Sequence, residues 1–123
     1  MAYDNKGLVL PFEAGADLSA KQHYLVYLDS ALKIQLVDAI TRPAIGILQN
    51  KPDASGKEAS VCVGGVSKIV LGATLGAGAL VGPAATGKAA ADASTNYTVG
   101  MLLKGGADTE KGTVLLRNYT AKA

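Results

Sequence analysis

One segment of the sequence approaches a known phosphate-binding motif. Residues 82–89 read GPAATGKA, close to the GxxxxGKS or GxxxxGKT loop, in which a hydroxyl after the lysine binds Mg²⁺ and a following helix holds the phosphates. Here Ala89 stands at the hydroxyl position, and the polar run 94–96 begins before a helix of useful length could form. We therefore predict that this segment is a hairpin turn that carries Lys88.

The other residues that could do chemistry are few. The chain has one histidine and one cysteine, His23 and Cys62. A serine or cysteine nucleophile would need His23 as its base, and a metal site would need several clustered ligands, which the sequence does not place near either residue. Glu13, Glu58 and Asp108 could meet in space, but the aromatic platforms of a sugar-cleaving cleft are missing. The sequence predicts no catalytic residues, no metal site and no cofactor.

Composition excludes two further classes of protein. The 123 residues carry a net charge of only +2, with 18% charged and 5% aromatic residues. That leaves neither a basic track for a phosphate backbone nor a stacking surface for bases, so no nucleic acid is expected as a partner. The apolar run 61–82 contains Lys68 and several glycines, which argues against a membrane-spanning helix. The first residues lack the pattern of a signal peptide, which predicts synthesis in a cytoplasm.

The apolar pattern favours strands throughout the chain. Alternating, β-branched and aromatic residues predict strands over 24–28, 32–37, 44–48, 59–71, 97–103 and 114–119. In the second of these, Leu32, Ile34 and Leu36 would share one face; a helix beginning after Ser30 is the alternative that the pattern leaves open. Gly46 is expected at a bulge or a close crossing of strands.

Together these elements predict an all-β fold. We expect one small single-domain β-barrel or β-sandwich of about seven to nine short strands. Its expected boundaries are an extended N-terminal arm over 1–12, the β domain over 13–120 and a tail over 121–123.

The two halves of the chain echo each other. Ala44-Ile-Gly-Ile-Leu48 in the first half resembles Thr98-Val-Gly-Met-Leu102 in the second, and Lys33 and Lys88 precede these segments by similar distances. An offset near 55 residues suggests two copies of one supersecondary unit. Chance similarity between glycine-rich apolar strands is the alternative, and both interpretations stay open from the sequence.

Three longer segments carry a resemblance to a known family. They are residues 10–26 (LPFEAGADLSAKQHYLV), 44–52 (AIGILQNKP) and 59–70 (ASVCVGGVSKIV). With the later segments Gly87-Lys-Ala89 and Tyr97-Thr-Val-Gly100, they resemble the capsid cement, or head decoration, proteins of tailed bacteriophages. The resemblance extends over about residues 8–116 and rests on glycine and apolar patterns.

The resemblance implies a structural role rather than catalysis. It implies a virion protein on the outer surface of the mature capsid, made in the host bacterial cytoplasm. It would bridge subunits of the phage major capsid protein and stabilise the head against the pressure of packaged DNA. It also implies a homo-oligomer, for which we expect a dimer or trimer, and no membrane partner. The alternative is a small β-barrel module that binds a glycan or peptide on a phage tail or fibre.

Two groups of apolar residues are candidate contacts with the capsid or between subunits. Leu8, Val9, Leu10 and Phe12 could add a strand to a capsid edge, although an ordinary first strand of the domain's own sheet would have the same pattern. Along the strand over 59–71, one face carries the apolar group that we predict as a subunit contact, namely Cys62, Val66 and Val70.

Overall fold

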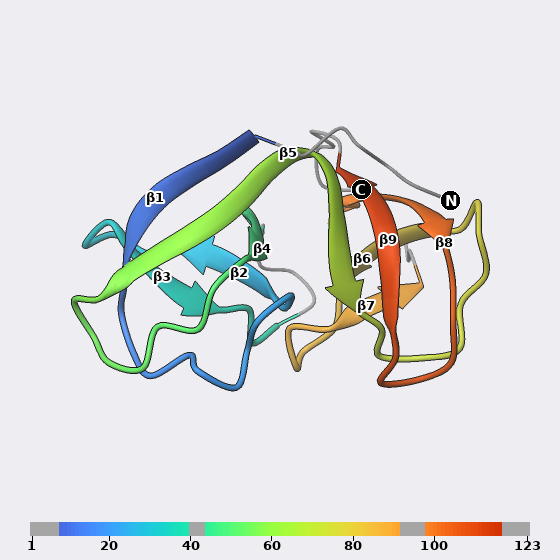
Figure 1. Cartoon of the computed structure of the whole chain (residues 1–123). Coiled ribbons are helices and arrows are strands. Elements are labelled where there is room, and N and C mark those ends of the chain that lie inside the picture. The colour runs from blue at the N-terminus through green and yellow to red at the C-terminus, as the bar shows by residue number, and fades with distance from the viewer. Residues whose placement is uncertain (1–7, 40–43, 92–97, 117–123) are drawn as a thin grey trace.

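The computed structural model describes residues 8–39, 44–91 and 98–116, and all of its regular elements are strands. Nine strands form one sheet (Figure 1). In chain order they are β1 (Leu8–Ala14), β2 (Leu25–Leu28), β3 (Lys33–Leu36), β4 (Gly46–Leu48), β5 (Glu58–Val70), β6 (Leu80–Pro83), β7 (Ala89–Ala91), β8 (Gly100–Lys104) and β9 (Lys111–Leu116). The prediction of a small all-β fold is confirmed. No helix in the described part of the chain is long and apolar enough to cross a membrane.

The first half closes into a five-stranded barrel. Its strands follow the order β1-β3-β2-β4-β5, and β5 pairs back to β1. Four of these pairings are antiparallel, while β1 and β3 run parallel, with Ala14 opposite Ile34. Closure removes the exposed sheet edges that would otherwise invite aggregation.

The second half repeats this arrangement strand by strand. The C-terminal part of β5 takes the place of β1, and β6, β7, β8 and β9 take the places of β2, β3, β4 and β5. A parallel bridge between Leu71 and Ala89 closes the ring, as the parallel pair Ala14–Ile34 does in the first half. The 13-residue β5 is therefore the last strand of one barrel and the first strand of the other, and Figure 1 shows it arching over both lobes.

The turns repeat as faithfully as the strands. Among the described residues, three that are not glycine have positive φ, namely His23 (68°), Leu32 (64°) and Thr109 (71°). Glycines with positive φ stand at the same places in the other half, namely Gly78, Gly87 and Gly56. The hydrogen bonds also match: Leu32 N–H donates to the Asp29 carbonyl, and Gly87 N–H donates to the Ala84 carbonyl. The structure thus supports the interpretation that the echo in the sequence is a repeat.

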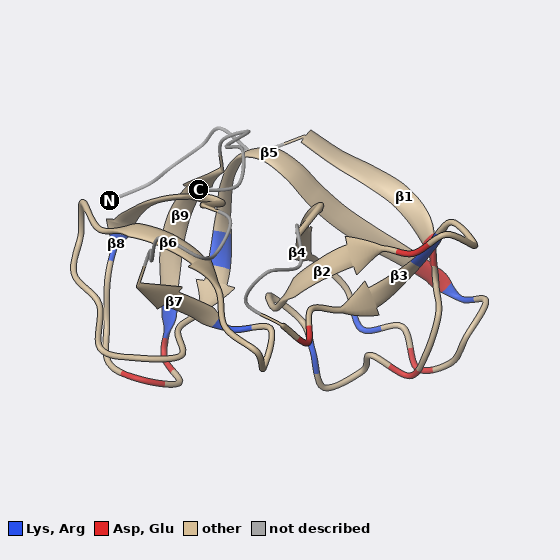
Figure 2. Ribbon diagram, turned by 180° about the vertical axis from the view of Figure 1, so that it is seen from behind, with Lys and Arg blue, Asp and Glu red and all other residues tan. Residues whose placement is uncertain are grey.

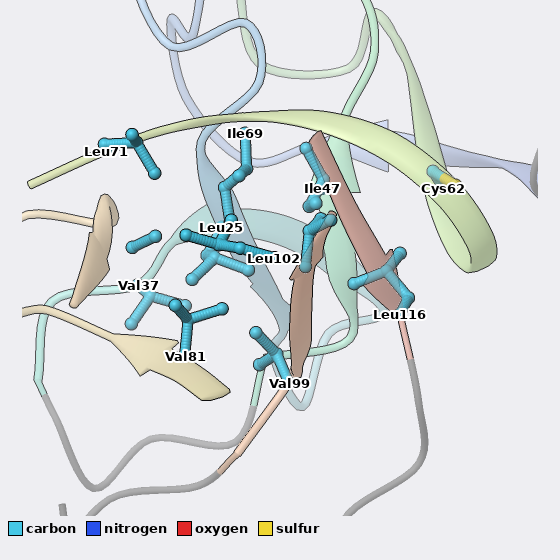
Figure 3. Packing of buried hydrophobic residues seen from close by; sticks show 12 residues of the cluster. Leu25, Val37, Ile47, Cys62, Ile69, Leu71, Val81, Val99, Leu102 and Leu116 are labelled. Atoms are coloured by element: carbon cyan, nitrogen blue, oxygen red, sulfur yellow. The ribbon is translucent and has the colours of Figure 1, made fainter. Parts of the chain in front are cut away.

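Apolar side chains form two packed clusters. One fills the first barrel and includes Val26, Ile34, Leu48 and Val61. The larger cluster fills the second barrel and extends across the boundary between the lobes, where Leu25, Ile47 and Cys62 of the first half join Val99 and Leu116 of the second (Figure 3). The larger cluster therefore contains residues of both lobes and holds them together.

Most predicted strands are present, and one expected face is wrong. Residues 33–36 are strand β3 rather than a helix, and residues 84–88 turn between β6 and β7 as predicted. However, Leu32 does not share the buried face of Ile34; it lies before β3 in a turn and is 71% exposed. Tyr97 and the residues after Leu116, which we expected in strands, lie outside the described residues.

Candidate docking surface

The first strand exposes three consecutive apolar residues. Leu8 is 62% exposed, Val9 45% and Leu10 37%. Because side chains alternate between the two faces of a strand, three exposed neighbours mean that both faces at this end of β1 are open. Covering such side chains would contribute about 1.5–3 kcal/mol for each that becomes fully buried.

Pairing with β5 holds this end of β1 in place. Val9 lies opposite Cys62 and Leu10 opposite Val61, and the register shifts between Leu8 and Val9, so that Leu8 lies opposite Gly64. Of the two alternatives for residues 8–12, the structure therefore contains the ordinary first strand. Residues 1–7 of the expected arm lie outside the described residues.

A cavity of about 320 Å³ adjoins the exposed strand. Its lining includes Val9, Cys62, Val66 and Lys68. It lies where β5 leaves the first barrel for the second, beside Gly65, whose φ of 84° lets the backbone turn. One member of each predicted contact group, Val9 and Val66, therefore lines the same concavity.

His23, Ser67 and Cys62 also line this cavity, which brings together the residue types of a nucleophilic site. The hydrogen bonds of Cys62 and Ser67 do not lead to His23. The Cys62 Sγ donates to the Gly64 carbonyl (3.3 Å), and the Ser67 Oγ donates to the Lys68 carbonyl (2.9 Å). The Gln49 amide donates to the Ser67 Oγ. Both candidate nucleophiles thus direct their protons to the backbone rather than to an imidazole.

The electrostatics of the cavity oppose nucleophile activation. Burial raises the pKa of the Cys62 thiol, which disfavours the thiolate. Burial and the nearby charges of Lys111, Lys68 and Lys51 lower the pKa of His23, which disfavours the imidazolium. An activated cysteine–histidine pair requires the reverse of both shifts. Among the described residues, no cluster of three or more histidine, cysteine or acidic side chains could hold a metal ion.

Charge is sparse around this surface. Figure 2 shows Lys, Arg, Asp and Glu mainly along the loops at the lower side of the two lobes, while the ribbon where β1 begins and β5 bends carries none of them among the described residues. The nearest acid–base pair on β1 is Glu13 with Lys33, at 3.7 Å near the other end of the strand. Lys68 is the one lysine, arginine or acidic residue among the described residues that line the cavity, and such a mostly apolar surface suits contact with another protein better than contact with a charged ligand.

The predicted contact residues fall into two groups by burial. Leu8, Val9 and Leu10 are exposed, and Val66 is partly exposed. Phe12 packs against the core of the first barrel, while Cys62 and Val70 are only 1% and 8% exposed. A subunit contact on the predicted face of β5 would therefore involve Val66 and its exposed neighbours, with Cys62 and Val70 acting through packing inside the chain.

One exposed residue was missed by the sequence prediction. Leu32 is the most exposed of the large apolar side chains in the described residues. The alternation of residues 32–37 placed it in the core, and the turn signal of Asp29-Ser-Ala31 was the available hint that the strand begins later.

One of the comparisons with known proteins gives a family, and another gives a similar fold. The model of the phage cement protein family matches residues 3–118. The structure is similar to the crystal structure of the N base of head fiber gp8.5 from bacteriophage phi29, with a TM-score of 0.67 and 12% sequence identity over 94% of this chain and 100% of that chain. At this identity the likeness shows a shared fold. No curated protein matches the chain.

Proposed function

Because the chain belongs to the phage cement protein family, we propose that it binds the outer surface of the mature phage capsid and stabilises the head by bridging subunits of the major capsid protein. The observation that carries this proposal is the family match over residues 3–118. The similar fold of a phage head fiber base supports the same place on the virion.

The exposed end of β1 is the proposed capsid contact. Leu8, Val9 and Leu10 make an apolar strip beside the cavity that Val66 lines. Packing a capsid segment along this strip would remove these apolar side chains from water. A modest contribution per copy suffices, since many copies act together on one capsid lattice.

The closed double barrel suits this role physically. Mainly antiparallel strand ladders close both barrels, and the larger apolar cluster joins the two lobes, so the protein can link two capsid subunits as a stiff body. The chemistry of the cavity supports a structural role as well, since neither Cys62 nor Ser67 is activated there. The protein would be made in the host cytoplasm and added to heads after they expand.

The test is co-sedimentation of purified protein with undecorated heads. Val9→Asp and Val66→Asp should each weaken binding to expanded heads about tenfold or more, because a charge would be buried in an apolar contact. Ser55→Asp is the matched control: it places the same charge on an exposed loop of the first half and should bind like wild type. Full binding by both Val9→Asp and Val66→Asp would overturn the assignment of this surface.

A further inference from the structure

The contact between the two lobes uses a row of three side chains. Leu25, Ile47 and Cys62 lie side by side across β2, β4 and β5, since Leu25 is paired with Ile47 and Ile47 with Cys62. They point away from the core of the first barrel and into the cluster that contains Val99 and Leu116 of the second. All three are at most 1% exposed.

The repeat places a corresponding row on the second barrel. Leu80 is paired with Met101 across β6 and β8, and Met101 with Leu115 across β8 and β9. This row has the same register as the first, but its three side chains are partly exposed. The second lobe therefore carries an apolar row like the one that the first lobe buries.

The first lobe has residues equivalent to those that contact the row inside the chain. Val99 and Leu116, which meet the row inside the chain, correspond by strand order and register to Ile45 and Val63 of the first barrel. Both of these side chains pack against the core of the first barrel and are still partly exposed. One lobe thus has a partly exposed row, and the other has a partly exposed end that corresponds to the one that contacts the first row.

The turns next to these surfaces differ in side-chain size in a way that matches the residues they would contact. Within the chain, the turn at Gly87 docks on the first lobe, where its carbonyl accepts a hydrogen bond from Leu25 N–H at 2.7 Å. There is no room for a side chain at Gly87, because a Cβ would overlap Leu36 and approach Tyr24. On the two partly exposed surfaces the large and small residues are exchanged. The first lobe has Leu32 at the position that corresponds to Gly87, and the second lobe has Ala91 and Ala79 at the positions that correspond to Leu36 and Tyr24.

Hydrogen bonds fix the turn that exposes Leu32, and the backbone of Leu32 is strained. The Asp29 carboxylate accepts hydrogen bonds from Ala31 N–H and Lys33 N–H, both at 2.9 Å, and from the Gln35 side chain at 3.1 Å. The φ of Leu32 is 64°, a left-handed conformation that is strained for a residue other than glycine. A strained and exposed leucine on a fixed turn points to a contact outside the chain.

From these relationships we infer that a second copy of this chain docks head to tail, with Leu80, Met101 and Leu115 of one copy on the open end of the first barrel of the next. Leu32 of the second copy fills the space above Ala79 and Ala91 of the first. This interface repeats the contact between the two lobes of one chain. It is heterologous, so it closes into a ring or extends into a chain of subunits. It does not depend on the capsid-binding role.

The test is sedimentation equilibrium of the full chain over a range of concentrations. It compares wild type with variants in which the large and small residues at positions 32 and 91 are exchanged. Wild type should associate into species heavier than the 12.4 kDa monomer. Leu32→Gly should weaken association about tenfold or more by leaving a void, while its thermal midpoint stays equal or rises because glycine relieves the strained φ. Ala91→Leu should weaken association by overfilling the same space.

The double variant with Leu32→Gly and Ala91→Leu should recover much of the affinity, because it recreates the pairing of Gly87 with Leu36. Val66→Asp should associate like wild type, and this control separates the proposed interface from a subunit contact on β5. A monomeric wild type up to roughly 100 µM would overturn the inference, as would additive losses in the double variant. Loss of head binding in Leu32→Gly with a monomeric wild type would assign Leu32 to the capsid instead.

Discussion

Gly46 and Gly100 occupy the same position in the two halves, each where two paired strands of its barrel approach closely. A Cβ on Gly46 would overlap the Cys62 carbonyl, and a Cβ on Gly100 would overlap the Leu115 carbonyl. Each glycine also faces the valine before its partner, Val61 or Val114. The two glycines that carry the echo in the sequence are therefore required for the same physical reason.

Gly46→Ala and Gly100→Ala should each destabilise the protein by about 2–4 kcal/mol, because the facing carbonyl belongs to the backbone and cannot move aside cheaply. The measurement is urea unfolding followed by circular dichroism. Gly76→Ala is the control, since nothing lies within 4 Å of a Cβ there, and it should change stability little. Equal effects at all three positions would contradict the close-crossing explanation.

At the positive-φ turns, a substitution to glycine should stabilise the protein rather than destabilise it. Thr109 has a φ of 71°, and its counterpart Gly56 has a φ of 91° with open space around it. Thr109→Gly should therefore raise the free energy of unfolding by about 0.5–1 kcal/mol, the relief of strain minus the added entropy of the unfolded chain. Gly56→Ala should lower it by a similar amount. Thermal unfolding of both variants checks this pair, and a stabilised Gly56→Ala would show that the two turns are not equivalent.

The sequence allowed the fold class and most strands to be predicted, because they depend on local patterns such as the alternation that indicated β3 and β5. The spacing of Gly46 and Gly100 suggested a repeat, but the sequence left chance similarity open, and the matching strand order decides between the two. Closure into two barrels could not be predicted, since it depends on parallel pairs such as Leu71 with Ala89 that connect distant segments. The placement of Leu32 failed because alternation cannot show where a turn ends. The predicted contact residues were separated only by tertiary burial, which hides Cys62 and exposes Val9.

The Cys62 thiol should be nearly unreactive in the folded protein. It is 1% exposed, and burial raises its pKa, so little thiolate exists at neutral pH. Titration with a chromogenic disulfide at pH 8 should give slow labelling, with rapid and complete labelling only after addition of urea. A rate in the native protein close to that of a free thiol would mean that the region around Cys62 opens readily.

The stability of the protein should fall as the pH drops below 6.5. Burial and the lysines around His23 lower its pKa from 6.5, and its Nδ1 is buried without a hydrogen-bond partner. Below pH 6.5 the unfolded chain therefore binds a proton at His23 more readily than the folded chain does. The contribution of the neutral His23 to the free energy of unfolding is complete above pH 6.5 and is lost as the pH falls toward the lowered pKa.

Urea midpoints measured between about pH 7.5 and pH 5 check this dependence. Asp17 and Asp29 titrate lower, because hydrogen bonds from the residues that follow them lower their pKa values from 3.8. His23→Asn is the control, since asparagine tolerates positive φ, and it should flatten the profile. An unchanged slope in His23→Asn would assign the pH dependence to another group.

The most direct test of the proposed role is the thermal release of packaged DNA from phage heads. Heads lacking this protein should be compared before and after addition of wild type, with Val9→Asp as the matched variant and dye access to DNA as the signal. We expect wild type to raise the temperature of DNA release and Val9→Asp to raise it less at equal concentration. Saturating binding of wild type with no change in the release temperature would contradict a stabilising role for this protein.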